Sequence, residues 1–201
     1  VLIGWSLLAA AMTAFVHVDA LVDTEHRLSA LVACLAGAAA LYTLLAARLN
    51  WRGAALPVLA LAPLLLLATA ASADFQRAPF EQGGYWAWPL ALAAHAATLR
   101  WAAPWWPPRG RHGAHAVGAL VVATLGAIAG RSAVLDWGDA GSAWPWLGWL
   151  MVPALLLVLL LGPALVRRWP LRELPEAYQR SAAGVLAVVM LLWTLAANGV
   201  S

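Results

Sequence analysis

The densest set of chemically competent side chains lies between residues 17 and 27, where three carboxylates and two imidazoles occur together. Carboxylate oxygens bind hard divalent cations, and a carboxylate or an imidazole can act as a general base. Asp19 and Asp23 are four positions apart, so a helical segment would place them on one face. The candidate catalytic residues are therefore Asp19, Asp23 and Glu25, and the candidate metal ligands are His17, Asp19, Asp23 and His26.

This polar segment has an enzymatic and a structural interpretation. Membrane glycosyltransferases that use polyprenyl-phosphate sugars often carry acidic residues in the loop after their first span, and the segment is similar to them at that level. The structural interpretation is an exposed loop whose acidic residues favour the N-terminus of the helix that follows. We expect the structural role, and therefore expect no enzymatic activity from this segment.

His95 is the second candidate, because it is an ionisable side chain inside a long apolar run. An ionisable group within a membrane suggests a proton relay or a ligand contact, and hence a transporter with a path near His95. A neutral histidine bonded to a neighbouring carbonyl or hydroxyl is the structural alternative, which we favour. His112 and His115 flank Arg109 and Arg111, and we expect both histidines at lipid headgroups.

The elements that must position these residues follow from composition. Of the 201 residues, 64% are hydrophobic and 10% charged, and the mean hydropathy is +0.79. A soluble domain is about 45–50% apolar and about 25% charged. None of the 12 basic or nine acidic side chains lies in seven apolar runs, which are 1–17, 28–47, 54–72, 85–99, 114–130, 145–166 and 181–198.

Each run suits one membrane-spanning helix. A bilayer core of about 30 Å requires about 20 apolar residues in a helix, and the fourth run approaches that length as 85–102. Continuous apolar runs exclude a membrane barrel, whose strands alternate polar and apolar residues. We predict an all-α, polytopic transmembrane helix bundle of about seven spans, forming a single transmembrane region over 1–201.

The distribution of arginine predicts the orientation. Connections 48–53, 100–113 and 167–180 contain nine of the 12 arginines, and arginine-rich short loops remain in the cytoplasm. The N-terminus is therefore expected in the cytoplasm and the C-terminus in the periplasm. The arginines expected to contact lipid headgroups are Arg109, Arg111, Arg167, Arg168 and Arg172.

Tryptophan and glycine carry further packing information. Indoles prefer the headgroup level, so we expect interfacial anchors at Trp51, Trp101, Trp105, Trp106 and Trp169 on one side and at Trp86, Trp88, Trp137, Trp144, Trp146 and Trp149 on the other. Stacking of the Trp105–Trp106 pair on a sugar or a base is the alternative. Gly126 and Gly130 have the small-xxx-small spacing that permits close contact between helices.

Several function classes are excluded or lack their motifs. The net charge of +3 comes from arginines spread over separate loops, so we expect no nucleic-acid partner. The chain has no Gly-rich phosphate loop, HExxH, nucleophile elbow or CxxC, so we expect no cofactor. Cys34 is the single cysteine, which excludes a disulfide framework within the chain.

Two stretches carry a family resemblance: Ala87-Trp88-Pro89-Leu90-Ala91-Leu92 with His95 and Leu99-Arg100, and the ending Leu192-Trp193-Thr-Leu-Ala-Ala-Asn198-Gly199. They resemble bacterial predicted membrane proteins labelled domain of unknown function 2339. Those proteins are longer, with more spans, so the resemblance implies a fragment, a bacterial inner-membrane location and partner helices outside this chain. It implies no catalytic residue.

We therefore expect a multi-pass inner-membrane module that serves as a structural or assembly part of a larger envelope protein. Its partners would be the lipid bilayer and the remaining transmembrane helices of that protein. The alternatives are a polyprenyl-phosphate-dependent glycosyltransferase that uses the first periplasmic loop, and a transporter with a path near His95.

Overall fold

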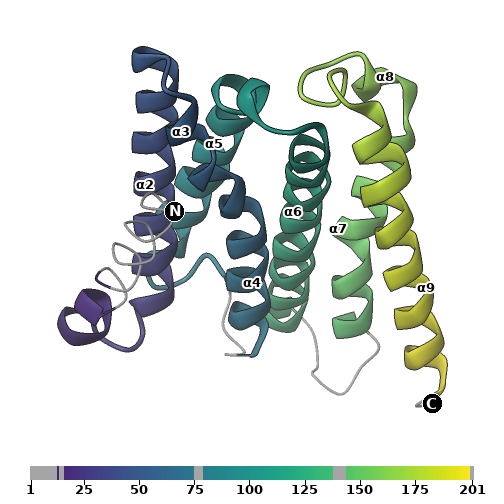
Figure 1. Ribbon diagram of the computed structural model, residues 1–201. Helices are drawn as coiled ribbons and strands as arrows, with labels where there is room; N and C mark the ends of the chain where they lie inside the picture. Colours follow the sequence, from purple (N-terminus) through teal and green to yellow (C-terminus); the bar gives the residue numbers. More distant parts are fainter. Residues whose placement is uncertain (1–12, 14–15, 75–78, 138–143, 200–201) are drawn as a thin grey trace. The chain divides into compact units, whose positions relative to one another are not determined.

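The computed structural model describes residues 13, 16–74, 79–137 and 144–199 (Figure 1). The described residues form helices joined by turns, without a strand, and the prediction of an all-α fold is confirmed. The chain divides into two compact units. The first contains 1–68 and 80–114, and the second contains 69–79 and 115–201.

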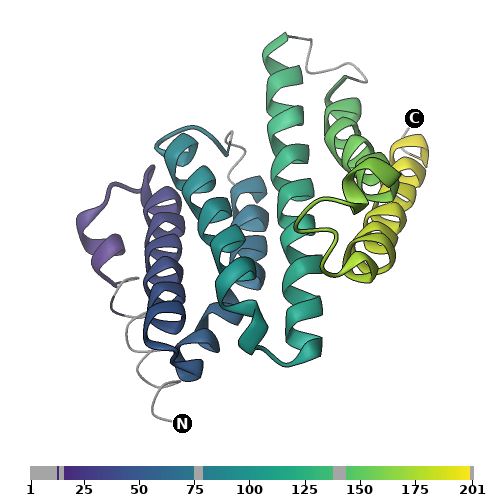
Figure 2. The same cartoon turned by 90° about the horizontal axis from the view of Figure 1, so that it is seen from above.

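The first unit is built on two parallel helices, α2 (Arg27–Leu49) and α5 (Gly84–Trp101). Figures 1 and 2 both show them side by side. Small residues let helix backbones approach closely in a membrane protein. Alanine is the most frequent of the buried residues on these two helices, with Ala36, Ala39 and Ala46 on α2 and Ala87, Ala91 and Ala94 on α5.

A buried hydroxyl pair joins α2 to α5 near their C-terminal ends. The Thr43 and Thr98 hydroxyl oxygens are 3.1 Å apart and hydrogen-bonded. The Thr98 hydroxyl also donates to the Ala94 carbonyl oxygen at 2.8 Å. Polar groups away from water must find partners within the protein, so this pair fixes the register of the two helices.

The run predicted at 54–72 is not one regular helix. It consists of α3 (Arg52–Ala55), the 3-10 turn η1 (Pro57–Ala60) and α4 (Leu61–Asp74). Pro57 begins the 3-10 turn, because proline lacks the N–H that an interior helical position would donate. Three apolar elements therefore share the length that one uniform helix would occupy.

Two tryptophans expected at the interfaces are buried instead. Trp88 on α5 is 1% exposed, and Trp106 is 6% exposed. The Trp106 indole N–H donates to the Ala55 carbonyl oxygen. It thereby satisfies one of the backbone acceptors that a helix end leaves open. The interfacial assignment of Trp88 and Trp106 is wrong, because both positions face neighbouring protein.

The second unit contains most of α6 (Pro108–Trp137), followed by α7 (Trp144–Leu161) and the short α8 (Pro163–Val166). A π-helical turn, η3 (Ala177–Ala182), leads into α9 (Ala183–Gly199). α7 and α9 lie side by side (Figure 2). The run predicted at 145–166 is interrupted at Gly162, which adopts an extended conformation before Pro163.

The close helix contact predicted from Gly126 and Gly130 is confirmed, and its partner is α7. A Cβ atom at Gly130 would lie 2.7 Å from the Gly148 carbonyl oxygen. A Cβ at Gly148 would lie 2.8 Å from the Arg131 Cα atom. Gly126 faces Val152 in the same way. The two backbones touch where they cross, and any side chain at Gly130 or Gly148 would separate them.

An aromatic cluster lies beside this crossing. Trp193 of α9 has its ring centroid 5.1 Å from that of Trp146 and 5.4 Å from that of Trp149. The Arg131 guanidinium lies over the Trp149 ring at 5.8 Å, which is within the range of a cation–π interaction. These contacts join α6, α7 and α9 at one end of the second unit.

Four helical stretches of the described chain are long and apolar enough to cross a membrane: Arg27–Leu49, Arg52–Ser72, Pro108–Leu135 and Ala177–Asn198. They correspond to the predicted runs 28–47, 54–72, 114–130 and 181–198. The apolar stretch Trp146–Leu161 is shorter, and α5 carries Tyr85, His95 and Arg100 among its 18 residues. Most of the run at 1–17 lies outside the described residues, so seven spans stay a prediction.

Candidate functional site

The polar segment at 17–27 is a helical turn over 16–21 followed by a loop that Arg27 holds in place. The Arg27 guanidinium forms a 2.6 Å ion pair with the Asp19 carboxylate. It also donates to the backbone carbonyl oxygens of Asp19 at 2.9 Å and Val22 at 3.2 Å. Arg27 therefore binds the open carbonyls at a helix end, which is a structural role for both Arg27 and Asp19.

The other candidates of this segment point to different partners. His17 hydrogen-bonds the Thr13 carbonyl oxygen at 2.8 Å. Glu25 accepts a 3.4 Å hydrogen bond from Gln82, whereas Asp23 is exposed. Among the residues that the structure describes, no three His, Cys, Asp or Glu side chains gather as a metal-binding group. The catalytic and metal-binding hypotheses for His17, Asp19, Asp23, Glu25 and His26 stay predictions.

His95 lies on the buried side of α5 with 7% of its surface exposed. The side chain has an interaction partner within the protein. Burial fits both interpretations of His95, because a structural histidine and a histidine on a transport path both lie inside the helices. The transporter hypothesis therefore stays a prediction.

A buried imidazole–hydroxyl pair joins two segments of the second unit. The His115 Nδ1 atom and the Tyr178 hydroxyl oxygen are 2.7 Å apart and share a hydrogen bond. His115 is 0% exposed and Tyr178 is 5% exposed. Their rings meet edge to face, with centroids 5.5 Å apart. We name these two residues the His115–Tyr178 pair.

The His115–Tyr178 pair lies where three segments of the second unit meet. His115 lies near the start of α6, and Tyr178 lies in the π-helical turn before α9. The apolar side chains around Tyr178 come from α6, α7 and the connection at 167–180: Ala116, Ala119, Leu156, Leu160, Leu171 and Leu174. π-helical turns are frequent at functional sites. Tyr178 is thus a candidate that the sequence interpretation missed.

The headgroup assignment of His115 is wrong. The side chain is completely buried, because α6 turns it toward Tyr178. The sequence held one signal for this pairing, namely that His115 lies inside the apolar run 114–130. A buried polar group requires a hydrogen-bond partner, and Tyr178 is close to the start of the run 181–198.

Most of the arginines assigned to headgroups are on the surface. Arg109, Arg167, Arg168 and Arg172 are exposed, whereas Arg111 is partly buried and has an interaction partner. In the first unit, the Arg52 guanidinium lies over the Trp105 ring, 5.0 Å from its centroid. This contact occupies one face of Trp105 and gives the indole a partner within the protein. Headgroup contact stays a prediction.

The fold and these sites define an all-α protein with helices that can cross a membrane. Comparison with protein-family models, with curated proteins and with solved structures found no match to this chain. The resemblance to domain of unknown function 2339 therefore stays a prediction.

Proposed function

We propose that this chain is a membrane-spanning helical module that contributes structure and assembly contacts to a larger bacterial inner-membrane protein. The observation that carries the proposal is that buried polar side chains hydrogen-bond one another in pairs. Thr43 bonds Thr98, and His115 bonds Tyr178. Each pair joins neighbouring helical segments of one unit, as expected for groups that hold a bundle together.

The proposed orientation places the arginine-rich connections in the cytoplasm. Because α2 and α5 run parallel, Arg48 and Arg100 lie at the same end of the first unit, in the last turns of their helices. Arginine there also interacts favourably with the negative end of each helix dipole. The opposite end carries one arginine, Arg27, among the described residues of the two helices and the turns before them, and this difference in arginine supports the positive-inside assignment.

Cysteine labelling tests this orientation. In a Cys34→Ala background, Pro107→Cys at the arginine-rich end should resist an impermeant thiol reagent added to intact spheroplasts. Thr24→Cys at the opposite end should react. Both positions are exposed, and neither substitution changes the charge that determines the orientation. Lysis should make Pro107→Cys reactive, which is the control for accessibility. The reverse labelling pattern would show that the orientation is inverted.

The same proposal predicts the behaviour of the acidic loop. If the chain is a structural module, an Asp19→Ala, Asp23→Ala double variant should restore a deletion strain as fully as the unmodified gene. The exposed Asp19–Arg27 ion pair contributes at most about 1 kcal/mol, so protein level should not change. Envelope glycan and protein level are the two readouts. Loss of glycan at an unchanged protein level would contradict the module proposal and support the transferase.

A further inference from the structure

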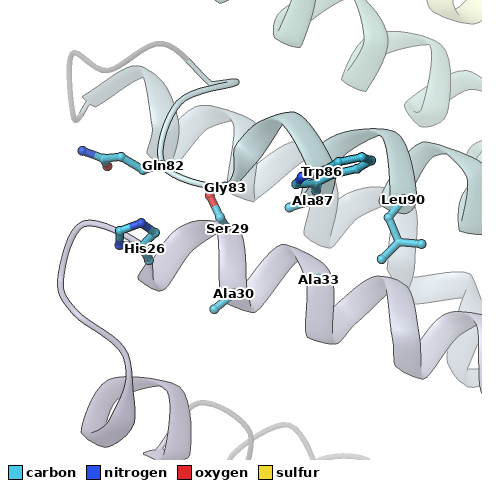
Figure 3. A pocket seen from close by; sticks show the side chains of 9 residues that line it. All are labelled: His26, Ser29, Ala30, Ala33, Gln82, Gly83, Trp86, Ala87 and Leu90. Atoms are coloured by element: carbon cyan, nitrogen blue, oxygen red, sulfur yellow. The ribbon is translucent and has the colours of Figure 1, made fainter.

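A groove lies between the N-terminal ends of α2 and α5, with a volume of about 270 Å³ (Figure 3). It belongs entirely to the first unit. Its walls are mostly apolar, and its polar groups lie at the end where the two helices begin. The lining residues are His26, Ser29, Ala30, Ala33, Gln82, Gly83, Trp86, Ala87 and Leu90.

The groove exists because small side chains face large ones. Ala30 and Ala33 line it from α2, and Ala87 lines it from α5. Trp86 and Leu90 are four residues apart, so they follow one face of α5. They are 72% and 51% exposed. A hydrocarbon chain lying in the groove would cover apolar surface that the helix pair itself leaves open.

Polar groups occur at one end of the groove. His26 and Ser29 lie there on the α2 side, and Gln82 lies across from them (Figure 3). Gln82 and Gly83 both have positive φ angles, 48° and 87°. This left-handed turn brings the start of α5 against α2, where a Cβ at Gly83 would lie 3.6 Å from the Ser29 Cβ atom. The surface of the groove itself is almost entirely apolar, so the imidazole, hydroxyl and amide groups of these residues would meet a lipid headgroup only at the rim.

Charge around the polar end distinguishes between headgroups. Gln82 donates to the Glu25 carboxylate at 3.4 Å, and Glu81 immediately precedes Gln82 in the chain. Both carboxylates are exposed. A headgroup that carries only negative charge would be repelled by them, whereas an ammonium group would be attracted. The charges therefore favour a headgroup that combines a phosphate with an ammonium group.

We infer that this groove binds one molecule of a zwitterionic phospholipid of the phosphatidylethanolamine type. One acyl chain lies along Ala30, Ala33 and Leu90. The phosphate accepts hydrogen bonds from His26, Ser29 or Gln82, and the ammonium group faces Glu25 and Glu81. The groove volume is close to the lower limit of about 300 Å³ for small-molecule pockets, so the groove encloses only part of one acyl chain.

The test compares lipid retention by the full chain and by a variant with a filled groove. The protein is reconstituted with phosphatidylethanolamine, extracted into mild detergent and examined by native mass spectrometry. We expect one lipid per chain for the unmodified protein. Ala33→Leu should retain roughly tenfold less, because displacing about two methylene groups from an apolar site has an effect of that size. Ala40→Leu, exposed on the same helix and outside the groove, should retain the lipid.

Two further comparisons complete the test. The unmodified protein should retain phosphatidylethanolamine several-fold better than phosphatidylglycerol, and a Glu25→Gln, Glu81→Gln variant should lose that preference. Ala30→Leu replaces Ala33→Leu if the latter does not give a monodisperse, cooperatively unfolding protein. Equal retention by the unmodified and groove-filled proteins would overturn the site. A preference for phosphatidylglycerol would overturn the assigned headgroup.

Discussion

Replacing Gly148 by alanine should destabilise the second unit by about 1–3 kcal/mol, the usual cost of inserting atoms into a closely packed contact. The added methyl group would meet the backbone of α6, at 2.8 Å from the Arg131 Cα atom and 2.9 Å from the Gly130 carbonyl oxygen. Backbone atoms cannot rotate away as a side chain can, so α6 and α7 must move apart. Gly130→Ala should have a similar effect, because its methyl group meets the Gly148 carbonyl oxygen.

Thermal unfolding of the purified chain in detergent would measure this effect, at about 2–4 °C per kcal/mol for a protein of this size. Gly184→Ala is the matched control in α9, because a Cβ there meets nothing within 4 Å. Alanine is the better helix former by about 0.5–1 kcal/mol, so the control should be as stable as the unmodified protein or slightly more stable. Equal thermal unfolding midpoints for Gly148→Ala and Gly184→Ala would disprove the close crossing of α6 and α7.

Tyr178→Phe should lower stability by between about 1 and 2 kcal/mol, because it leaves a buried imidazole nitrogen without its hydrogen-bond partner. The phenylalanine keeps the ring among Leu171, Leu174 and the other apolar neighbours, so the change isolates the hydroxyl. Tyr85→Phe is the control, because the Tyr85 side chain is 57% exposed. Its hydroxyl can exchange a protein partner for water, and we expect no measurable effect.

A double-mutant cycle separates the bond from the packing around it. His115→Leu removes the imidazole, and combining it with Tyr178→Phe removes both polar groups. Replacing both partners of a buried hydrogen bond by apolar groups costs much less than orphaning one of them. The losses of unfolding free energy in the two single variants should therefore add up to more than the loss in the double variant, by about 0.5 kcal/mol or more. Strict additivity would mean that the His115–Tyr178 bond contributes nothing to stability.

The helical architecture could be predicted because it depends on a property of each segment alone. A run of about 20 residues without charge must satisfy its backbone groups internally in a membrane, and the helix does so. The spacing of Gly126 and Gly130 likewise indicates a close contact, since only small residues allow it. Neither the uncharged runs nor the glycine spacing shows which helix α6 contacts. Gly148 is the contact point because of how α7 is rotated and tilted, which depends on the whole unit.

The tryptophans illustrate the same limit. Trp86 and Trp88 are two residues apart on α5, yet the first is 72% exposed and the second 1%. Two positions along a helix correspond to about 200° of rotation, so the two indoles face opposite sides. Composition places both near the end of a span, and only the packing of α5 against its neighbours decides which is buried. Tyr178 was missed for a related reason, because its burial depends on His115 and on leucines from its own loop.

The parallel pairing of α2 with α5 has a consequence for biosynthesis. Thr43 and Thr98 are 55 residues apart in the chain, so α2 emerges from the ribosome well before α5 exists. During that interval the face of α2 that carries Ala36, Ala39 and Thr43 has no partner from α5, and lipid or an insertion factor must cover it. Synthesis proceeds at about 5–20 residues per second, which makes the interval several seconds long. The contact between α2 and α5 therefore forms only after both helices have been synthesised.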